Sequence, residues 1–194
     1  MVESVSESES MSEDMDKIDD SAPQKSEVQR APRKKATERR KQLRQRLWPE
    51  ALDEHLWIRT QKTGFTTIPR TMPLIMRIMD SLAGKGTPVS MPYLTLWCWT
   101  FDEAFVEIRN PKQFAYESGF SGPRAESLWK SRMRRLEELE FIRSRPGLSG
   151  DFHYILLINP ILVIENNYKE KGSDVAFDTL LGRLAEVGAD DLDF

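Results

Sequence analysis

Residues that form covalent cross-links or hold metal ions are scarce in this chain. Cys98 is the only cysteine, so no internal disulfide can form, which favours a reducing compartment. We expect the Cys98 side chain to be buried as a small apolar group among the aromatic residues of TLWCWTF. The two histidines, His55 and His153, are too few and too widely separated to suggest a metal site. We therefore expect neither a bound metal ion nor a cofactor.

Long hydrophobic runs are also absent, and only 39% of the residues are hydrophobic. The first residues, MVESVSESESMSEDMD, are acidic and lack the apolar centre of a secretory signal peptide. No apolar run approaches the length of a membrane span. These absences predict a protein without a membrane partner that resides in the cytoplasm, associated with the nucleoid if it is bacterial.

The sequence offers no credible set of catalytic residues. Asp102 and Glu103 are adjacent, so on a helix their side chains would point apart and form a poor catalytic pair. Ser118 and Ser121 have no histidine or lysine in the pattern to activate them. The GKG of residues 84–86 fits a loop that ends a helix better than a phosphate-binding motif. We expect that the protein is not an enzyme.

Charge is divided unevenly along the chain, although the formal net charge is only −3. Residues 1–30 hold three basic and nine acidic residues, and residues 172–194 hold one basic and six acidic. Residues 31–171 hold 24 basic and 16 acidic residues, a net of +8. A basic middle between two acidic ends indicates a polyanionic partner more strongly than the overall charge does.

This charge pattern, together with composition, predicts four segments. Residues 1–30 lack large apolar side chains and are expected to form a disordered acidic tail. Residues 31–63 are expected to be a basic helical extension, in which Pro49 starts a second helix that ends at Gly64. Its Arg30–Arg46 run suits nucleic acid, a membrane surface or a localisation signal, or is simply a solvated helix. Residues 64–172 are expected to be the folded domain, and residues 173–194 an acidic tail with one short amphipathic helix.

Capping and periodicity predict a mostly α-helical domain with a small β-hairpin, an α+β fold. We expect helices from Thr71 to Gly84 and from Pro92 to about Ala104. These are followed by a short strand at 105–108, a helix from Asn110-Pro111 to Gly119, and a long helix opening at Pro123. Residues 141–145 and 152–158 are expected to pair as a hairpin, and Asn159-Pro160 to start a further helix, NPILVIENNY, as a candidate dimer interface.

Residues from about Thr71 to Ile158, which include the stretch AYESGFSGPRAESLWKSRMRRLEELEFIRS (residues 115–144), resemble a winged helix-turn-helix domain. The resemblance rests on Ala115, Gly119, the helix opening at Pro123, the run RLEELEFI and the hairpin after it. It implies that Ala115 packs between two helices and that Gly119 supplies the turn between them. Many members of the family have glycine where this chain has Glu140, so this residue must either be strained or take another route out of the helix.

The resemblance implies a recognition helix, whose faces can be laid out at about 100° per residue. The side expected to face the core comprises Ala125, Leu128, Trp129, Met133, Leu136 and Leu139. The residues expected to contact DNA are Lys112, Gln113, Arg124, Ser127, Lys130, Ser131, Arg134, Arg143 and Arg145, with His153 near the tip of the hairpin. A solvated helix and an edge strand protected by charge are the alternative interpretations of the same residues.

Two functions from different classes follow. The first is a double-stranded DNA-binding protein, either a transcriptional regulator or a replication or partition factor of a plasmid or other mobile element, which can form a homodimer. The second is a protein-protein interaction module built on a winged helix.

Overall fold

The computed structural model describes residues 27–189, which form two compact units divided between Gln61 and Lys62. The expected disordered tail, residues 1–30, falls mainly outside the described residues. Its last four positions belong to helix α1, Glu27–Leu47. The helix therefore begins before the basic run, and it ends one residue short of Trp48.

The first unit continues after α1 with two short 3-10 turns, η1 (Asp53–His55) and η2 (Arg59–Gln61). The expected second helix after Pro49 is therefore wrong. The apolar residues that suggested it, Leu52 and Trp57, stay 54% and 69% exposed. A short amphipathic segment gains most of its helical stability from a buried face, and here no core accepts one.

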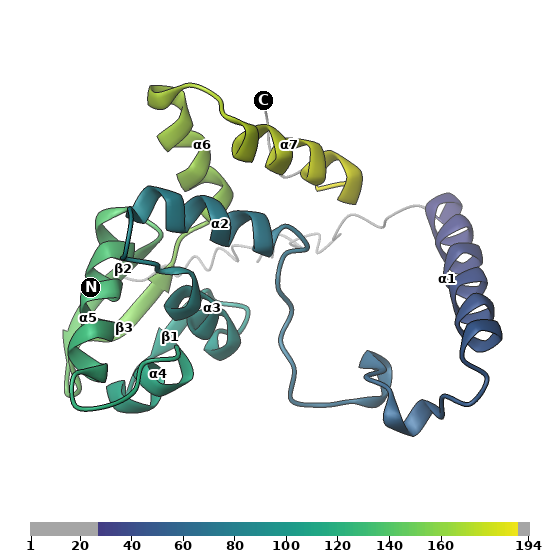
Figure 1. Ribbon diagram of the computed structural model, residues 1–194, viewed down its shortest axis with the longest axis horizontal. Coiled ribbons are helices and arrows are strands. Elements are labelled where there is room, and N and C mark those ends of the chain that lie inside the picture. Colours follow the sequence, from purple (N-terminus) through teal and green to yellow (C-terminus); the bar gives the residue numbers. More distant parts are fainter. Residues whose placement is uncertain (1–26, 190–194) are drawn as a thin grey trace, which may run out of the picture. The chain divides into compact units, whose positions relative to one another are not determined.

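The second unit combines six helices with a three-stranded sheet (Figure 1). The helices are α2 (Met72–Ala83), α3 (Ser90–Trp99), α4 (Pro111–Glu117), α5 (Ala125–Glu138), α6 (Pro160–Lys171) and α7 (Val175–Val187). The strands are β1 (Phe105–Glu107), β2 (Ile142–Gly147) and β3 (Gly150–Leu157). The expected mixture of helices with a small hairpin is confirmed, and β1 extends the hairpin to a sheet.

The Asn-Pro pairs start helices as the sequence predicts. Asn110 Oδ1 accepts a hydrogen bond from the backbone N–H of Gln113 at 3.3 Å, at the start of α4. Asn159 Oδ1 does the same for the N–H of Ile161 at 3.0 Å, at the start of α6. Each cap satisfies a donor that the first helical turn leaves without a partner, while the following proline lacks that donor.

The sheet is antiparallel with the order β1-β3-β2. Ile155 of β3 lies between Val106 of β1 and Ser144 of β2. Because side chains alternate along a strand, Val106 and Ile155 face the core, while the neighbouring Tyr154 is exposed. The sheet therefore has one buried and one solvated face.

Trp129 of α5 lies at the centre of an aromatic cluster in the core. Its ring lies 6.4 Å from that of Phe114 in α4 and 6.0 Å from that of Phe152 in β3. Met133 and Leu136 continue the same face of α5 and are fully buried. This stripe fixes which side of α5 is left for solvent.

Helix α7 belongs to the folded unit, whereas the sequence suggested a tail from residue 173. Leu180 and Leu184 are buried, and α7 packs beside α2 (Figure 1). The apolar side chains of α6 also turn inward: Val163 and Ile164 are buried, and Leu162 remains 48% exposed. Much of the apolar surface that suggested a dimer helix is thus used within the chain.

Two residues expected in the core, Cys98 and Leu128, are exposed instead. Cys98 is exposed, and Trp99 is 39% exposed, with its Nε1 donating to Glu117 Oε2 at 2.6 Å. Helix α3 is apolar around much of its circumference, so its sequence does not reveal which side is buried. Leu128 is 41% exposed, because Trp129 fills the core side of that turn of α5.

The exit of α5 is formed by a non-glycine residue in the left-handed region, Glu140, at φ 65°. The N–H of Glu140 donates to Glu137 O at 2.9 Å and that of Phe141 donates to Leu136 O at 3.0 Å. This is the Schellman arrangement, which glycine adopts without steric cost. Glu140 therefore leaves the helix through the strained backbone conformation and does not take another route.

Glu140→Gly is therefore expected to stabilise the protein by about 0.5–1 kcal/mol. Relief of the left-handed strain exceeds the extra entropy that glycine gives the unfolded chain. Thermal unfolding should show a midpoint higher by about 2 °C. Glu140→Ala keeps the positive φ and serves as the control, so an equal gain in that variant would show that the backbone is not the cause.

Candidate nucleic-acid interface

The turn between α4 and α5 sets the relative position of these two helices. Ala115 is fully buried, and its carbonyl accepts the N–H of Phe120 at 2.9 Å. Gly119 has φ +84°, and its N–H donates to Tyr116 O at 2.9 Å. A Cβ on Gly119 would meet open space, so it is the backbone angle that requires glycine here. Ala115 is thus packed inside the fold, and Gly119 forms the turn that follows α4.

The face of α5 opposite the buried stripe carries polar and cationic side chains. Arg124, Ser127, Ser131 and Arg134 are all exposed. Ser127 Oγ donates to Arg124 O at 2.9 Å, which ties the first turn together. Among the described side chains, those of residues 35–189, none forms an ion pair with Arg124 or Arg134. Both guanidinium groups are therefore available to an external anion.

Lys130, by contrast, already has a partner on the same helix. Its Nζ lies 2.7 Å from Glu126 Oε1, an (i, i+4) pair. The hydrogen bond from Lys130 lowers the pKa of the Glu126 carboxyl, and the nearby positive charge of Lys112 lowers it further. Lys112 of α4 and Lys130 of α5 thus both interact electrostatically with one carboxylate, which reduces the net positive charge of this part of the surface.

The other expected contact in α4, Gln113, is exposed but engaged. Its Nε2 donates to Glu117 Oε1 at 2.9 Å, and its backbone N–H is taken by Asn110. The side chain and the backbone N–H of Gln113 are therefore both used within α4 and its cap. Lys112 remains the exposed cation of this turn.

Strand β2 places two arginines beside the last turn of α5. Glu137 Oε1 accepts hydrogen bonds from Ser144 N at 2.8 Å and Ser144 Oγ at 2.7 Å. Arg143 and Arg145 flank Ser144 and, by the alternation of the strand, project from the solvated face of the sheet, where both are exposed. Glu137 thus accepts from both the backbone and the side chain of Ser144, which joins the end of α5 to β2.

His153 is buried beneath the hairpin and does not reach its surface. Its Nδ1 lies 2.7 Å from Ser149 Oγ, and its Nε2 lies 3.5 Å from Glu107 Oε1. The Ser149 hydroxyl donates to Ile108 O. These contacts connect the hairpin tip to β1, which indicates a structural role for His153 in place of a contact with DNA.

Two arginines of α5 that the sequence did not single out hold the helix in place. Arg135 donates from Nη2 to Leu82 O at 2.9 Å and from Nε to Ala83 O at 3.2 Å, at the end of α2. Arg132 Nη2 donates to Gly86 O at 3.1 Å. These acceptors lie some fifty positions away in the chain, so no local pattern could separate Arg135 from its neighbour Arg134.

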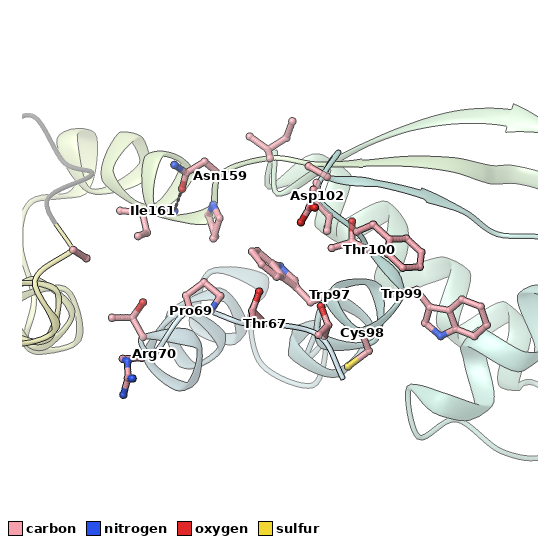
Figure 2. A pocket seen from close by; sticks show the side chains of 18 of the residues that line it. Thr67, Pro69, Arg70, Trp97, Cys98, Trp99, Thr100, Asp102, Asn159 and Ile161 are labelled. Atoms are coloured by element: carbon pink, nitrogen blue, oxygen red, sulfur yellow. Dashed lines mark hydrogen bonds between the residues drawn. The ribbon is translucent and has the colours of Figure 1, made fainter. Parts of the chain in front are cut away.

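A cavity of about 1110 Å³ lies elsewhere in the second unit (Figure 2). It is lined by the 64–71 segment, the end of α3 with Trp97 and Cys98, the start of α6 with Asn159, and the end of α7. Among the described residues that line it, none belongs to α4 or α5. The cavity is therefore separate from the cationic face of α5.

The described part of the chain was also searched for metal sites and for membrane-spanning helices. No group of three or more His, Cys, Asp or Glu side chains is placed there to hold a metal ion. No helix of residues 27–189 combines the length and the apolar character that crossing a bilayer requires. Comparisons with family models, curated proteins and solved structures found no match to this chain.

Proposed function

We propose that this protein binds double-stranded DNA, with α5 as a recognition helix and the β2–β3 hairpin as a wing. The observation that carries the proposal is the exposed face of α5, where Arg124 and Arg134 have no ion pair with any described side chain, while the opposite face is buried in the core. A recognition helix needs this division between a packed side and a free polar side. Arg143 and Arg145 add two exposed cations on β2, on the solvated face of the sheet.

The arrangement of elements supports a winged helix-turn-helix interpretation. Helix α3, strand β1, the tight pair α4–α5 and the hairpin β2–β3 follow one another in the chain, and the strands pair in the order β1-β3-β2. In this proposal Arg124 and Arg134 contact base edges or phosphates, Ser127 and Ser131 contact either, and the hairpin arginines lie along the DNA backbone. Regulation of transcription, and replication or partition of a mobile element, are the processes that use such sequence-selective binding.

A salt titration of the full-length chain on a duplex tests the proposal. Neutralising phosphates releases counterions, so the logarithm of the binding constant should fall with the logarithm of the salt concentration by about 0.9 per phosphate contact. The double variant Arg124→Ala/Arg134→Ala should lower that slope by about 2. Arg183→Ala, on the exposed surface of α7, is the control. Equal losses in both variants, or no binding at about 50 mM salt, would count against the proposal.

Glu126→Gln is expected to strengthen DNA binding severalfold at low salt. The substitution removes a negative charge from the proposed contact surface and releases Lys130 from its 2.7 Å ion pair. The free Lys130 and the neighbouring Lys112 could then both neutralise phosphate. Fluorescence anisotropy of a labelled duplex measures the change. Affinity that stays the same or falls would place the duplex away from this turn.

The exposed face of the sheet favours the second candidate, a protein-interaction module. Phe105, Tyr154 and Leu156 are each 40–44% exposed on it, and the rings of Phe105 and Tyr154 stack at 6.0 Å. Contiguous exposed apolar side chains often mark a contact with another protein. If no duplex binds and Tyr154→Lys abolishes self-association or partner binding, this function replaces the first.

A further inference from the structure

One face of helix α1, in the first unit, carries a row of cationic and polar side chains. Lys35, Arg39, Gln42 and Arg46 are spaced at i, i+4, i+7 and i+11, which places them within about 60° of one another around the helix. All four side chains are exposed. With a rise of about 1.5 Å per residue, this basic row is about 17 Å long.

The basic row has no partner of opposite charge among the side chains of residues 35–189. Elsewhere on α1, Arg44 pairs with Asp53 at 2.6 Å, and Arg40 Nε donates to Ala36 O at 3.2 Å. No such ion pair occupies Lys35, Arg39 or Arg46. The row therefore presents three cations that the chain's described residues leave without neutralisation.

The helix also has no core to account for its charge pattern. Leu43 and Leu47 stay 45% and 53% exposed, so α1 buries little apolar surface. Repulsion between like charges at i, i+4, such as Lys35 and Arg39, opposes helix formation. A helix with little buried surface and repelling cations gains stability when a polyanion lies along it.

We propose that the basic row of α1 binds the sugar-phosphate backbone of duplex DNA, as a second contact outside the α5 surface. This inference rests on the proposed function for its choice of polyanion. Double-stranded DNA presents one negative charge per about 1.7 Å of axis, so a row about 17 Å long meets several phosphates wherever it lies. Because phosphates carry no sequence information, the row adds affinity and does not select bases.

An anionic membrane fits α1 less well than DNA does. Interfacial helices bury a continuous apolar side of large residues in the lipid. Within residues 35–47, α1 offers only Ala36, Leu43 and Leu47 on the face beside the basic row. Too little apolar surface is present for a stable interfacial position, whereas backbone phosphate requires none.

The test compares two double variants of the full chain that remove equal charge from α1. Arg39→Gln/Arg46→Gln removes cations of the basic row, and Arg40→Gln/Lys41→Gln removes cations of other faces. Glutamine keeps good helix propensity, and circular dichroism confirms that both variants fold. On a duplex of 30 base pairs, the first variant should bind about tenfold more weakly near 100 mM salt, with a slope lower by about 2. The second should change the slope by less than about 0.5.

Equal losses in the two variants would overturn the inference, because they would show a general effect of net charge. Loss of binding to phosphatidylserine vesicles by the first variant, with unchanged DNA binding, would overturn it in favour of a membrane. The failure of the proposed function is a different result: Arg124→Ala/Arg134→Ala would have no effect while the first variant still weakens binding. If both pairs matter, their losses should add, since distant contacts act independently.

Discussion

Trp129→Ala is expected to lower the free energy of unfolding by about 3–5 kcal/mol. Trp129 is 1% exposed and lies between Phe114 and Phe152, so alanine leaves a large cavity where three elements meet. A loss of this size is a large fraction of the stability of an ordinary domain. Urea unfolding followed by circular dichroism measures it, and unfolding already in buffer would agree with the expectation.

The matched control is the adjacent residue. Leu128 is 41% exposed, so Leu128→Ala should cost less than about 1 kcal/mol. Helical spacing places both residues on the buried side of α5, and only the structure distinguishes them. Comparable losses in the two variants would mean that α5 is rotated about its axis, which would also move Arg124 and Arg134 away from solvent.

Arg135→Ala is expected to destabilise the protein by about 2 kcal/mol. Its guanidinium donates to two carbonyls at the end of α2, and hydrogen bonds from a charged group are stronger than neutral ones. The side chain is 35% exposed, so solvent screening keeps the loss well below that of a buried pair. Thermal unfolding should show a midpoint lower by about 5 °C.

The substitution of the neighbouring residue, Arg134→Ala, should instead affect DNA binding and leave stability almost unchanged. Its side chain is exposed and has no ion pair in the described chain, so its loss should change stability by less than about 0.5 kcal/mol while weakening DNA binding. Arg135→Lys should not restore stability, because a lysine cannot reproduce the two-directional fork of the guanidinium. A variant of Arg134 that unfolds early, or a lysine that rescues position 135, would contradict these roles.

Local signals in the sequence were sufficient for most of the second unit. Asn-Pro pairs, the Gly119 turn and the spacing of apolar residues depend on contacts within a few residues, and the structure has the helices and the hairpin near the expected positions. The buried stripe of Trp129, Met133 and Leu136 was likewise predictable from its helical spacing.

The failures share a different physical origin. The segment after Pro49 has helical spacing but no core to pack on, and spacing alone cannot reveal that absence. Cys98 lies on a helix whose apolar residues surround much of its axis, so its exposure depends on neighbours from distant segments. Arg135 anchors α5 to the end of α2, far away in the chain. The Glu126 carboxylate interacts with Lys130 on its own helix and with Lys112 on another. The tail expected from residue 173 contributes Leu184 to the core for the same reason.

The buried His153 beneath the hairpin affects how much conformational entropy the hairpin would lose on binding a partner. A side chain on Gly147 would come within 2.3 Å of the His153 ring, so the loop closes directly onto an imidazole that is itself held from β1. A flexible arm must surrender its conformational freedom when it docks, and that entropy is subtracted from the affinity. The hairpin has already lost this conformational freedom when the protein folds. A larger share of the free energy of each proposed arginine–DNA contact is therefore left as binding affinity.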